Sequence, residues 1–563
     1  MSRNANGRFS QVPTADVGRS KFDRSCSIKT TFNTGELIPF YVDEVLPGDT
    51  FSIDTSKVVR LQTPLTPFMD NIFLDTYYFF VPARLCWEHW INFQGENTDS
   101  AWVSPNVYTV PQITAPTGGW QVGTVADYMG IPTGIAGLSV NALPFRAYSL
   151  IYNEWFRDEN LQDPVNVSLG DATQTGSNGS NPITDTPLGG KPFVAAKLHD
   201  YFTSALPAPQ KGPDVEIPLL SDSALLPVST YNSNVPKSTV PLRFSPSAVS
   251  SFPSSDKALP LAFTGNGSTS RALNYFTTGF SSGALDPSGS YMPAVPTNLW
   301  ADTSVLESGV AATINSLRLA FQTQKYFEKL ARGGSRYIES IKAMFNVTNP
   351  DYRLQRPEYL GGDRVPIVVN QIIQSSESTS QSPQGTVTGQ SLTTSRHSDF
   401  TKSFTEHGYV IGILVARYHH TYQQGLNKMW SRRDVLDFYF PVFANLGEMP
   451  IKNKEIYAQG TDVDDEVFGY QEAWAEYRYR PSFVTGEMRS QFSKSLDVWH
   501  LADDYSELPT LSAGWIVEDK TNVDRVLAVT SQVSNQFFAD IYIKCIATRP
   551  MPVFSIPGLI DHH

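Results

Sequence analysis

Apolar residues are concentrated in a block near the start of the chain, residues 36–90, where proline-rich turns separate three strand-like runs. The last run, residues 72–81, is rich in Phe, Tyr, Ile and Leu and is followed by Pro82, which is typical of a β-strand. Side chains alternate between the two faces of a strand, and both sets here are largely apolar. We therefore expect a central strand that further chain, or another subunit, covers on both sides. The two predicted faces are Ile72, Leu74, Tyr78 and Phe80 on one side and Phe73, Tyr77, Phe79 and Val81 on the other.

The last third of the chain returns to strand patterns, at residues 408–418, 435–443, 525–530 and 537–548. The final run alternates most clearly, because Asp540, Tyr542 and Lys544 lie opposite an apolar face. Strands at both ends of the chain, with helices and loops between them, predict a mainly β sandwich closed by sequence-distant pairing, as in a jelly roll. The apolar face consists of Phe537, Ala539, Ile541, Ile543, Cys545 and Ala547.

Residues 141–160 have helical spacing instead, with Pro144 acceptable in a first turn. The side opposite the apolar stripe carries Arg146, Asn153 and Arg157. We interpret it as a solvated face rather than a partner contact. The apolar stripe consists of Phe145, Tyr148, Tyr152, Trp155 and Phe156.

Residues 213–303 are poor in charge and rich in Ser, Pro, Thr, Asn and Gly, but scattered apolar residues still give the stretch something to pack. This composition indicates an elaborated surface insertion rather than pure disorder. A second helix is predicted for residues 312–332, which Gly333 and Gly334 would end. The expected division is a basic N-terminal arm at 1–35, a first part of the sandwich with helix and loops at 36–212, the insertion at 213–303, and the remainder of the sandwich with helix and loops at 304–563.

Charge is distributed unevenly, because the whole chain has a net charge of −12 while residues 1–30 hold six basic side chains against two acidic ones. A short basic arm on an acidic body can contact nucleic acid or another subunit, although an ordinary disordered terminus has the same composition. The basic residues of the arm are Arg3, Arg8, Arg19, Lys21, Arg24 and Lys29.

The three cysteines, Cys26, Cys86 and Cys545, have no CxxC spacing, so the sequence supports neither a disulfide framework nor a zinc site. No apolar signal segment follows the start, and the longest aliphatic run, residues 410–416, is too short to cross a bilayer. We expect a soluble product made in a reducing cytosol, with no cofactor or metal.

Catalytic signatures are missing from the sequence: no phosphate-binding loop, no HExxH and no GxSxG occurs. His419 and His420 follow a strand and would point to opposite faces, so a satisfied or exposed pair is favoured over a metal site. The acidic turn at 462–466 lacks the EF-hand spacing and is interpreted as a solvated loop. Paired carboxylates of a glycosidase, or aromatic platforms of a carbohydrate-binding sandwich, remain open alternatives to a non-enzymatic structural protein.

Several long motifs carry a resemblance to one family. The chain resembles the major capsid proteins of the Microviridae, specifically the gokushovirus branch of small single-stranded DNA bacteriophages. The matching stretches are 29–33 (KTTFN), 39–50 (PFYVDEVLPGDT), 77–82 (YYFFVP), 143–148 (LPFRAY), 151–158 (IYNEWFRD), 199–207 (HDYFTSALP), 209–211 (PQK) and 545–550 (CIATRP).

The resemblance implies an eight-stranded viral jelly roll with long inserted loops, which self-assembles into the smallest icosahedral shell around circular single-stranded DNA. It implies that the insertion at 213–303 forms a protrusion at the threefold axes that contacts a host surface receptor. The protein would be made in the host bacterial cytoplasm and become part of the virion.

Assembly would then be the function. The basic arm is the candidate for the inner surface, where it would contact DNA phosphates or small basic DNA-binding or pilot proteins. The aromatic residues of the central strand and the first helix would supply core or subunit contacts, each modest but multiplied by symmetry. These candidates are Tyr77, Phe79, Tyr148, Tyr152, Trp155 and Phe156.

Overall fold

The computed structural model describes residues 18–96, 108–213, 215, 314–376, 378 and 383–554, together with short strands between residues 228 and 301. The chain divides into two compact units. The first consists of Met1–Lys211 together with Glu328–His563, and the second of Gly212–Phe327.

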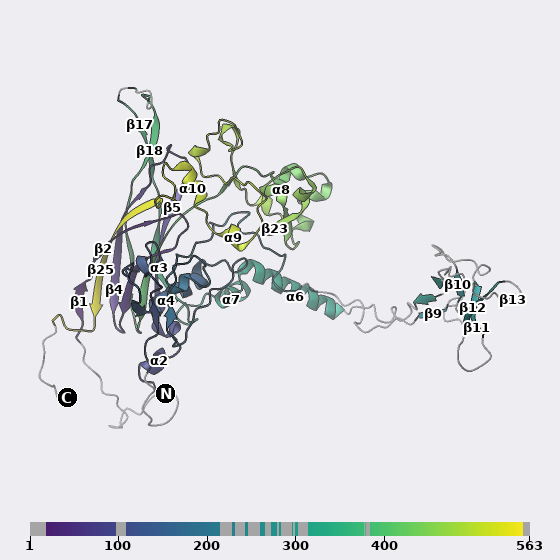
Figure 1. Cartoon of the computed structure of the whole chain (residues 1–563), viewed down its shortest axis with the longest axis horizontal. Helices are drawn as coiled ribbons and strands as arrows, with labels where there is room; N and C mark the ends of the chain where they lie inside the picture. The colour runs from purple at the N-terminus through teal and green to yellow at the C-terminus, as the bar shows by residue number, and fades with distance from the viewer. Residues whose placement is uncertain are drawn as a thin grey trace. The chain divides into compact units, whose positions relative to one another are not determined.

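Two antiparallel sheets form the sandwich of the first unit, and their strands run side by side in Figure 1. The β25 sheet has the order β2, β25, β4, β19, with the short β1 (Ser20–Asp23) also paired to β25. The β5 sheet has the order β16, β5, β20, β3. The eight long strands are β2 (Cys26–Phe32), β3 (Ile38–Val45), β4 (Thr50–Leu61), β5 (Ile72–Pro82), β16 (Glu358–Pro366), β19 (Thr393–Ser403), β20 (Gly408–Tyr418) and β25 (Phe537–Arg549).

The connectivity follows one rule: the first four long strands pair with the last four in reverse order. Strand β2 pairs with β25, β3 with β20, β4 with β19, and β5 with β16. A long antiparallel ribbon wound around a sandwich produces this order, which is the jelly-roll arrangement. Pairing between distant segments, such as Phe32 opposite Phe537, confirms the sandwich expected from the sequence.

Strand β5 is central in its sheet and buried on both faces, as its sequence predicts. On the inner face Tyr78 and Phe80 join the core between the two sheets. On the outer face Phe79 and Val81 join a second apolar cluster, which lies between the β5 sheet and the elements that cover it. The strand therefore has cover from its own chain on both sides.

The main cover on the β5 sheet is α4 (Leu143–Ile151), which continues as a π-helical turn, η2 (Tyr152–Phe156). The side-chain oxygen Oδ1 of Asn141 accepts a hydrogen bond from the Leu143 amide, and Pro144 occupies the first turn, where its missing N–H costs nothing. The helix predicted for 141–160 is therefore real but shorter, because Arg157 is already extended.

The prediction that Arg146, Asn153 and Arg157 form a solvated face of this helix is wrong. Arg146 is 3% exposed and donates to the carbonyls of Cys86 and Gly170. Asn153 and Arg157 are half-buried and likewise donate to backbone carbonyls of the loop that follows. Loop carbonyls need donors when a helix packs against them, and these polar side chains supply them.

The strands predicted for residues 435–443 and 525–530 are not formed. Residues 435–443 form two 3₁₀ turns, η5 (Val435–Asp437) and η6 (Pro441–Phe443), because Asp437 accepts the amides of Arg433 and Asp434, and Pro441 has no N–H for a ladder. Residues 525–530 begin as the last turn of α10 (Thr521–Val526).

The sequence also hides strands. Residues 374–394 have a loop-like composition, but β18 (Val387–Ser391) lies within them and pairs with β17 (Val369–Ile373), which precedes them. Strand β19 begins at Thr393. Strand β19 is rich in Ser, Thr and charged residues because one of its faces is open to solvent. Such a strand lacks the apolar run that marks a covered one.

The N-terminal and C-terminal ends of the 212–334 stretch meet at one point of the first unit. The Lys211 ammonium donates to Ser335 Oγ at 2.7 Å and to Asn160 Oδ1 at 3.2 Å. Glu159 accepts the Ser335 amide and lies 3.6 Å from Lys211 Nζ. Burial disfavours the Glu159 carboxylate, but these partners outweigh it and lower its pKa. We call these four residues the insertion clamp.

The second unit contains a five-stranded sheet in the order β13, β12, β11, β10, β14 and a separate pair of β15 with β9. Helix α6 (Ile314–Gly333) confirms the second predicted helix, of which residues 312 and 313 lie outside the described part of the chain. The strands of the second unit are β9 (Val228–Thr230), β10 (Arg243–Ser245), β11 (Leu259–Thr264), β12 (Ala272–Thr277), β13 (Ser281–Ser282), β14 (Val295–Pro296) and β15 (Leu299–Ala301).

None of the helices among the described residues is long and apolar enough to cross a membrane. Short helices, strands and 3₁₀ turns complete the first unit. The helices are α1 (Ala83–Cys86), α2 (Trp90–Phe93), α3 (Val125–Tyr128), α7 (Tyr337–Phe345), α8 (Asn453–Ile456) and α9 (Ala513–Ile516). The short strands are β6 (Gln112–Thr114), β7 (Ser139–Asn141), β8 (Gln174–Thr175), β21 (Thr421–Tyr422), β22 (Met449–Lys452), β23 (Val467–Gln471) and β24 (Ser482–Phe483). The remaining 3₁₀ turns are η3 (Thr186–Leu188), η4 (Lys428–Ser431), η7 (Asp462–Asp465), η8 (Ala475–Tyr477), η9 (Gly486–Met488) and η10 (Asp497–Trp499).

Candidate interaction surfaces

The six aromatic candidates from the sequence lie together inside the first unit. The ring of Phe79 is 5.5 Å from that of Trp155, and the ring of Tyr77 is 5.3 Å from that of Phe156. Tyr148 and Tyr152 both stack on Phe193, and the Tyr148 hydroxyl donates to the carbonyl of Leu37 at 2.7 Å. The structure thus places these residues between the β5 sheet and its helical cover. Burial raises the pKa of Tyr152 to about 12, so its hydroxyl stays protonated.

The basic candidates lie apart from one another. Arg3 and Arg8 are outside the described residues, whereas Arg19 and Lys21 are exposed at the start of β1. Residues 20–23 and 26–32, which the sequence places in the arm, are strands of the β25 sheet. Arg24 forms a bidentate pair with Asp43, at 3.1 Å from Nε and 2.5 Å from Nη2.

Lys29 lies on the outer face of the β25 sheet, the face turned away from the sandwich core. Its neighbours follow from the strand register, which sets side chains of adjacent strands in rows. One row consists of Ser27, Tyr542, Ser56 and Arg396, the next of Lys29, Asp540, Val58 and Thr394, and the third of Thr31, Phe538 and Arg60. We call these residues the open face.

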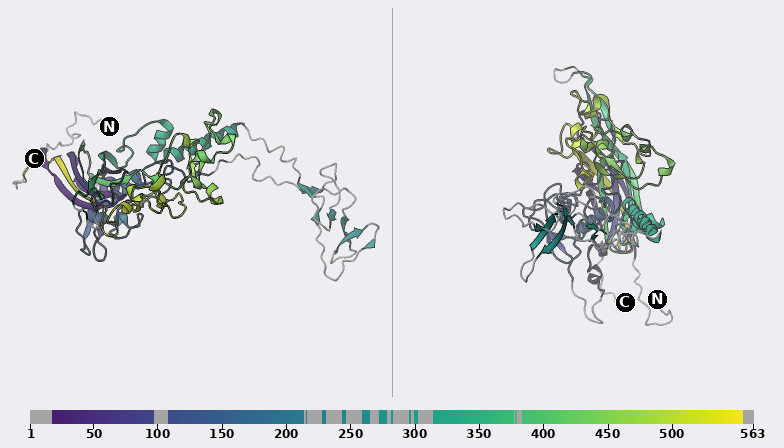
Figure 2. Two further views of the ribbon diagram at one scale, coloured as in Figure 1. Left: turned by 90° about the horizontal axis from the view of Figure 1, so that it is seen from above. Right: turned by 90° about the vertical axis from the view of Figure 1, so that its right-hand side faces the viewer.

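The open face stays accessible across its middle. Val58, Phe538 and Tyr542 are 39%, 38% and 48% exposed. In Figure 2 the purple and yellow strands of this sheet lie at the margin of the first unit. Two shallow hollows occupy the face, one of about 790 Å³ beside Phe538 and one of about 420 Å³ beside Tyr542.

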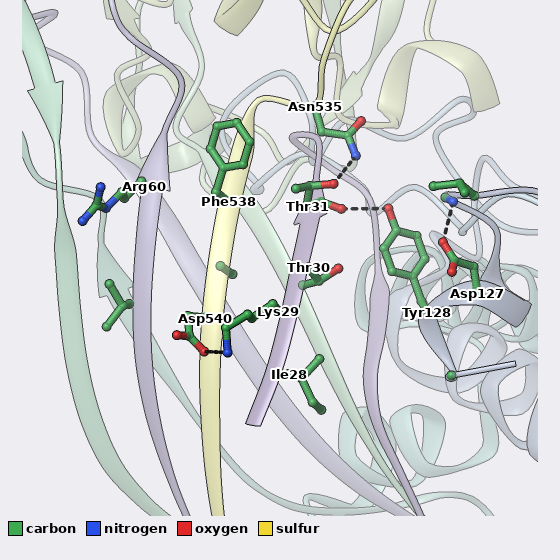
Figure 3. A pocket seen from close by; sticks show the side chains of 15 residues that line it. Ile28, Lys29, Thr30, Thr31, Arg60, Asp127, Tyr128, Asn535, Phe538 and Asp540 are labelled. Atoms are coloured by element: carbon green, nitrogen blue, oxygen red, sulfur yellow. Dashed lines mark hydrogen bonds and ion pairs between the residues drawn. The ribbon is translucent and has the colours of Figure 1, made fainter. Parts of the chain in front are cut away.

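Figure 3 shows the larger hollow, with β25 between β4 and β2. Lys29 Nζ lies 3.5 Å from Asp540 Oδ1, while Arg60 points away from the other labelled side chains. Tyr128 forms one wall, and its hydroxyl donates to the carbonyl of Thr31 at 2.9 Å. Asn535 donates to the hydroxyl of Thr31 at 2.9 Å. The walls are therefore held in place by hydrogen bonds, and the Lys29 ammonium also donates to Ser27 Oγ at 3.4 Å.

A second uncovered surface is strongly apolar. Trp430, Val435 and Val442 are 70%, 71% and 87% exposed. The backbone beneath them is anchored, because Trp474 Nε1 donates to the carbonyl of Phe443 at 3.0 Å and Asp437 accepts two amides. We call it the 430–446 surface, and it consists of Trp430, Val435, Leu436, Phe438, Tyr439, Phe440, Val442 and Leu446.

One cation reinforces the same region. The Arg432 guanidinium lies 4.3 Å from the centre of the Tyr477 ring and 3.1 Å from Glu476 Oε1. These two contacts hold the Arg432 side chain, and with it the turn that carries Arg432, against the segment of Glu476 and Tyr477. The sequence did not reveal this surface, because an apolar run between turns has the composition of a strand. The signals against burial were Asp437 and Pro441 inside the run and Asp434 just before it.

The histidine pair follows the sequence interpretation. His419 is exposed and packs against the edge of Phe73, whereas His420 is buried and bonded through both ring nitrogens. Its partners are Asp503 Oδ1 at 2.8 Å and Glu518 Oε1 at 3.1 Å. Burial disfavours the imidazolium, but the two carboxylates outweigh it and raise the pKa of His420 to about 10. Among the described residues, no group of His, Cys, Asp and Glu is arranged to hold a metal ion.

A jelly-roll sandwich that leaves a rigid apolar surface uncovered has the features of a structural subunit, whose surfaces bind other chains. The model of the family described as "Capsid protein (F protein)" matches residues 10–559. The chain is 44% identical to capsid protein VP1 of Chlamydia phage 1, over 98% of this chain and 97% of that one.

Two further relatives match as completely. Capsid protein VP1 of Bdellovibrio phage phiMH2K is 43% identical over 99% of this chain and 98% of its own length. Capsid protein VP1 of Spiroplasma virus 4 is 42% identical over 98% of this chain and 97% of its own. The chain therefore belongs to the capsid protein (F protein) family, a structural rather than catalytic one. These relatives confirm the resemblance to the gokushovirus branch of the Microviridae.

Proposed function

We propose that this capsid protein self-assembles into a small icosahedral shell that encloses circular single-stranded DNA. The observation that carries the proposal is the 430–446 surface, which the rest of the described chain leaves uncovered. A soluble monomer rarely exposes so many large apolar side chains together. Within a shell, neighbouring copies of the same chain would cover them.

The energetics suit reversible assembly. Full burial of one Val, Leu or Phe side chain contributes roughly 1.5–3 kcal/mol, so a few such residues per contact give a modest affinity. Association also costs translational and rotational freedom, which keeps each single contact weak. Closed symmetry multiplies weak contacts, and misplaced subunits dissociate before the shell closes.

The insertion at residues 213–303 belongs to the proposal as the part that contacts the host. Support comes from the division of the chain, since Gly212–Phe327 forms a compact unit of its own. A turn-rich insertion of low charge can vary without disturbing the sandwich, which suits an exposed protrusion that binds a receptor.

The basic residues at the N-terminus are proposed to face the enclosed DNA or a small basic partner protein. Replacing Arg3, Arg8 and Arg19 together by Ala tests this role. We expect particles that assemble but package less DNA, measured as the ratio of absorbance at 260 and 280 nm of purified particles. Unchanged packaging would leave the arm a role in subunit contacts alone.

The shell itself is tested by electron microscopy and size-exclusion chromatography of the purified protein. We expect uniform shells, or the small oligomers from which shells grow. The variant Val435→Asp with Leu436→Asp places two charges on the 430–446 surface, and burying unpaired charge is costly. Assembly should be lost while the fold is retained.

The matched control is Val533→Asp, since Val533 is 81% exposed and lies outside the 430–446 surface. It should form shells like the unmodified protein. Shells formed equally well by the Val435→Asp and Leu436→Asp variant would show that this surface is not a subunit contact.

A further inference from the structure

We propose that the open face of the β25 sheet binds single-stranded nucleic acid through base stacking and phosphate contacts, independently of sequence. This inference rests on the proposed function, because the enclosed DNA supplies the ligand. It adds a DNA contact on a sheet of the sandwich to the one proposed for the N-terminal arm.

Cations outnumber carboxylates on this face. The open face has the three cations Lys29, Arg60 and Arg396 and the one carboxylate Asp540. The next row along β25 and β4 adds one of each, Lys544 and Asp54. The remaining outward residues on β2, β4 and β19 are mainly Ser and Thr, whose hydroxyls bond equally well to phosphate, sugar or base edges.

Two aromatic rings stand among these cations. Phe538 and Tyr542 are four residues apart on one face of β25, which places them about 13 Å apart along the strand. Two rings at this separation would stack on bases that are not adjacent, with the intervening nucleotide over Asp540 and Val58. Aromatic stacking accepts every base, because each base has a π-face.

Each ring borders a hollow that also contains a cation. The hollow beside Phe538 is lined by Lys29 and Arg60 as well as Asp127 and Asp540, and the hollow beside Tyr542 by Arg396 as well as Asp540. A base stacked on the ring would therefore have its phosphate within reach of an ammonium or guanidinium group. Two aromatic and cation sets on one sheet form a track rather than a single site.

The existing ion pair does not compete strongly with phosphate. Lys29 and Asp540 are 3.5 Å apart, and their side chains are 75% and 52% exposed. Exposed pairs of this kind contribute little to stability and exchange partners readily. The backbone beneath them is fixed by pairing on both sides of β25, so binding would need only side-chain movement.

The test is fluorescence polarisation of full-length protein with fluorescein-labelled oligothymidylate of about 20 nucleotides, at several salt concentrations. Phe538→Ala with Tyr542→Ala should weaken binding at least tenfold, because stacking on both rings is lost. Lys29→Gln with Arg60→Gln and Arg396→Gln should lower the slope of log affinity against log salt by about 2.

The matched controls are Tyr337→Ala and Arg353→Gln, which remove an exposed ring and an exposed cation outside the open face. They should bind like the unmodified protein. Electron microscopy of every variant separates binding from assembly, since open-face substitutions should leave shells intact.

Three results would overturn the inference while the shell-forming function stands. The first is unmodified protein that forms shells but binds no oligonucleotide in any state. The second is binding by the open-face variants that equals binding by the controls. The third is loss of shells with binding retained, which would make the face a contact between copies of the chain. Failure of the unmodified protein to form shells in any preparation would instead overturn the proposed function.

Discussion

The two sheets of the sandwich share one core but differ on their outer faces. The β5 sheet presents Phe79 and Val81 outward, and both are buried beneath α4 and its neighbouring loops. The β25 sheet presents Phe538 and Tyr542 outward, and both remain exposed. An aromatic residue on a strand therefore does not by itself reveal whether its face is covered.

The charged neighbours explain the difference. On the covered face, the carboxylate of Asp75 receives Arg364 and Arg417, each at 2.6 Å. Burial alone would raise its pKa, but the two guanidinium groups outweigh burial and lower it. On the open face, Asp540 lies 3.5 Å from the Lys29 ammonium, both side chains are exposed, and the Ser27 hydroxyl donates to its carboxylate at 3.1 Å. A protein covers a charged face only where each charge has a close partner, because unpaired buried charge is costly.

The largest expected effect compares one residue type on the two faces. Phe79→Ala should lower the free energy of unfolding by about 3–5 kcal/mol, because it leaves a cavity beneath α4. Phe538→Ala should change it by less than about 1 kcal/mol, since the ring is already partly in water. Urea unfolding of the two purified variants measures both values. Equal losses would mean that the two outer faces are covered alike.

The next effect depends on pH and concerns the end of β20, in the covered sheet. His420 has a pKa of about 10 in the fold against an ordinary value of 6.5. Its stabilisation is therefore complete below about pH 6.5 and is lost as pH rises towards 10, at up to about 1.4 kcal/mol per pH unit. His420→Gln should remove this dependence, measured as the difference in unfolding free energy from the unmodified protein between pH 7 and 9.

The neighbouring exposed residue provides the control for this titration. His419→Gln should keep the dependence of the unmodified protein, because His419 is exposed. A His420→Gln variant with an unchanged pH dependence would show that the buried imidazole is neutral in the fold.

A smaller effect concerns the link between the two sheets. Lys57 on β4 is buried and donates to Thr76 Oγ1 at 2.8 Å and Asp363 Oδ2 at 3.3 Å, which lie on β5 and β16. Lys57→Met should cost about 1–3 kcal/mol, because it leaves the carboxylate of Asp363 without its cation. The double variant with Asp363→Leu should recover part of this loss in urea unfolding. Strictly additive losses would show that the pair does not couple the sheets.

The smallest effect compares two tyrosine hydroxyls. Tyr148→Phe removes a buried donor to the Leu37 carbonyl and should cost about 1–3 kcal/mol. Tyr128→Phe removes a donor to the Thr31 carbonyl at the edge of the open face and should cost about 0.5–1 kcal/mol, because water can replace it. Thermal unfolding of both variants shows which one loses more stability. A larger loss for Tyr128→Phe would contradict the exposure of this edge to water.

Strand patterns in the sequence predicted the elements that bury apolar residues. Strands β5, β20 and β25 were all expected, because Phe, Ile, Val and Tyr dominate them or alternate strictly. Strand β19 was missed because its outward residues are Ser, Thr and Arg, and only pairing with β4 reveals it as a strand. Local sequence predicts a strand reliably only when the strand packs against other elements and therefore carries apolar residues.

Surface function was harder to predict for a related reason. The run at 435–443 was interpreted as a buried strand, because composition alone does not distinguish cover by the same chain from cover by another. Arg146 was assigned to solvent, because the carbonyls that it satisfies belong to distant segments. Lys29 was correctly noted as basic, but its neighbours on β25 lie more than five hundred positions away in the chain. Register across the sheet, which the sequence does not display, brought them together.

The insertion clamp has a consequence for how such a chain changes over generations. Because Lys211 and Ser335 are joined by a hydrogen bond of 2.7 Å, the two ends of the 212–334 stretch lie next to each other in the first unit. A replacement segment therefore has to bridge only a short distance between its two ends. Added length in such a segment costs little loop-closure entropy. Recombination between related genomes can thus exchange this segment as a unit without redesign of the sandwich.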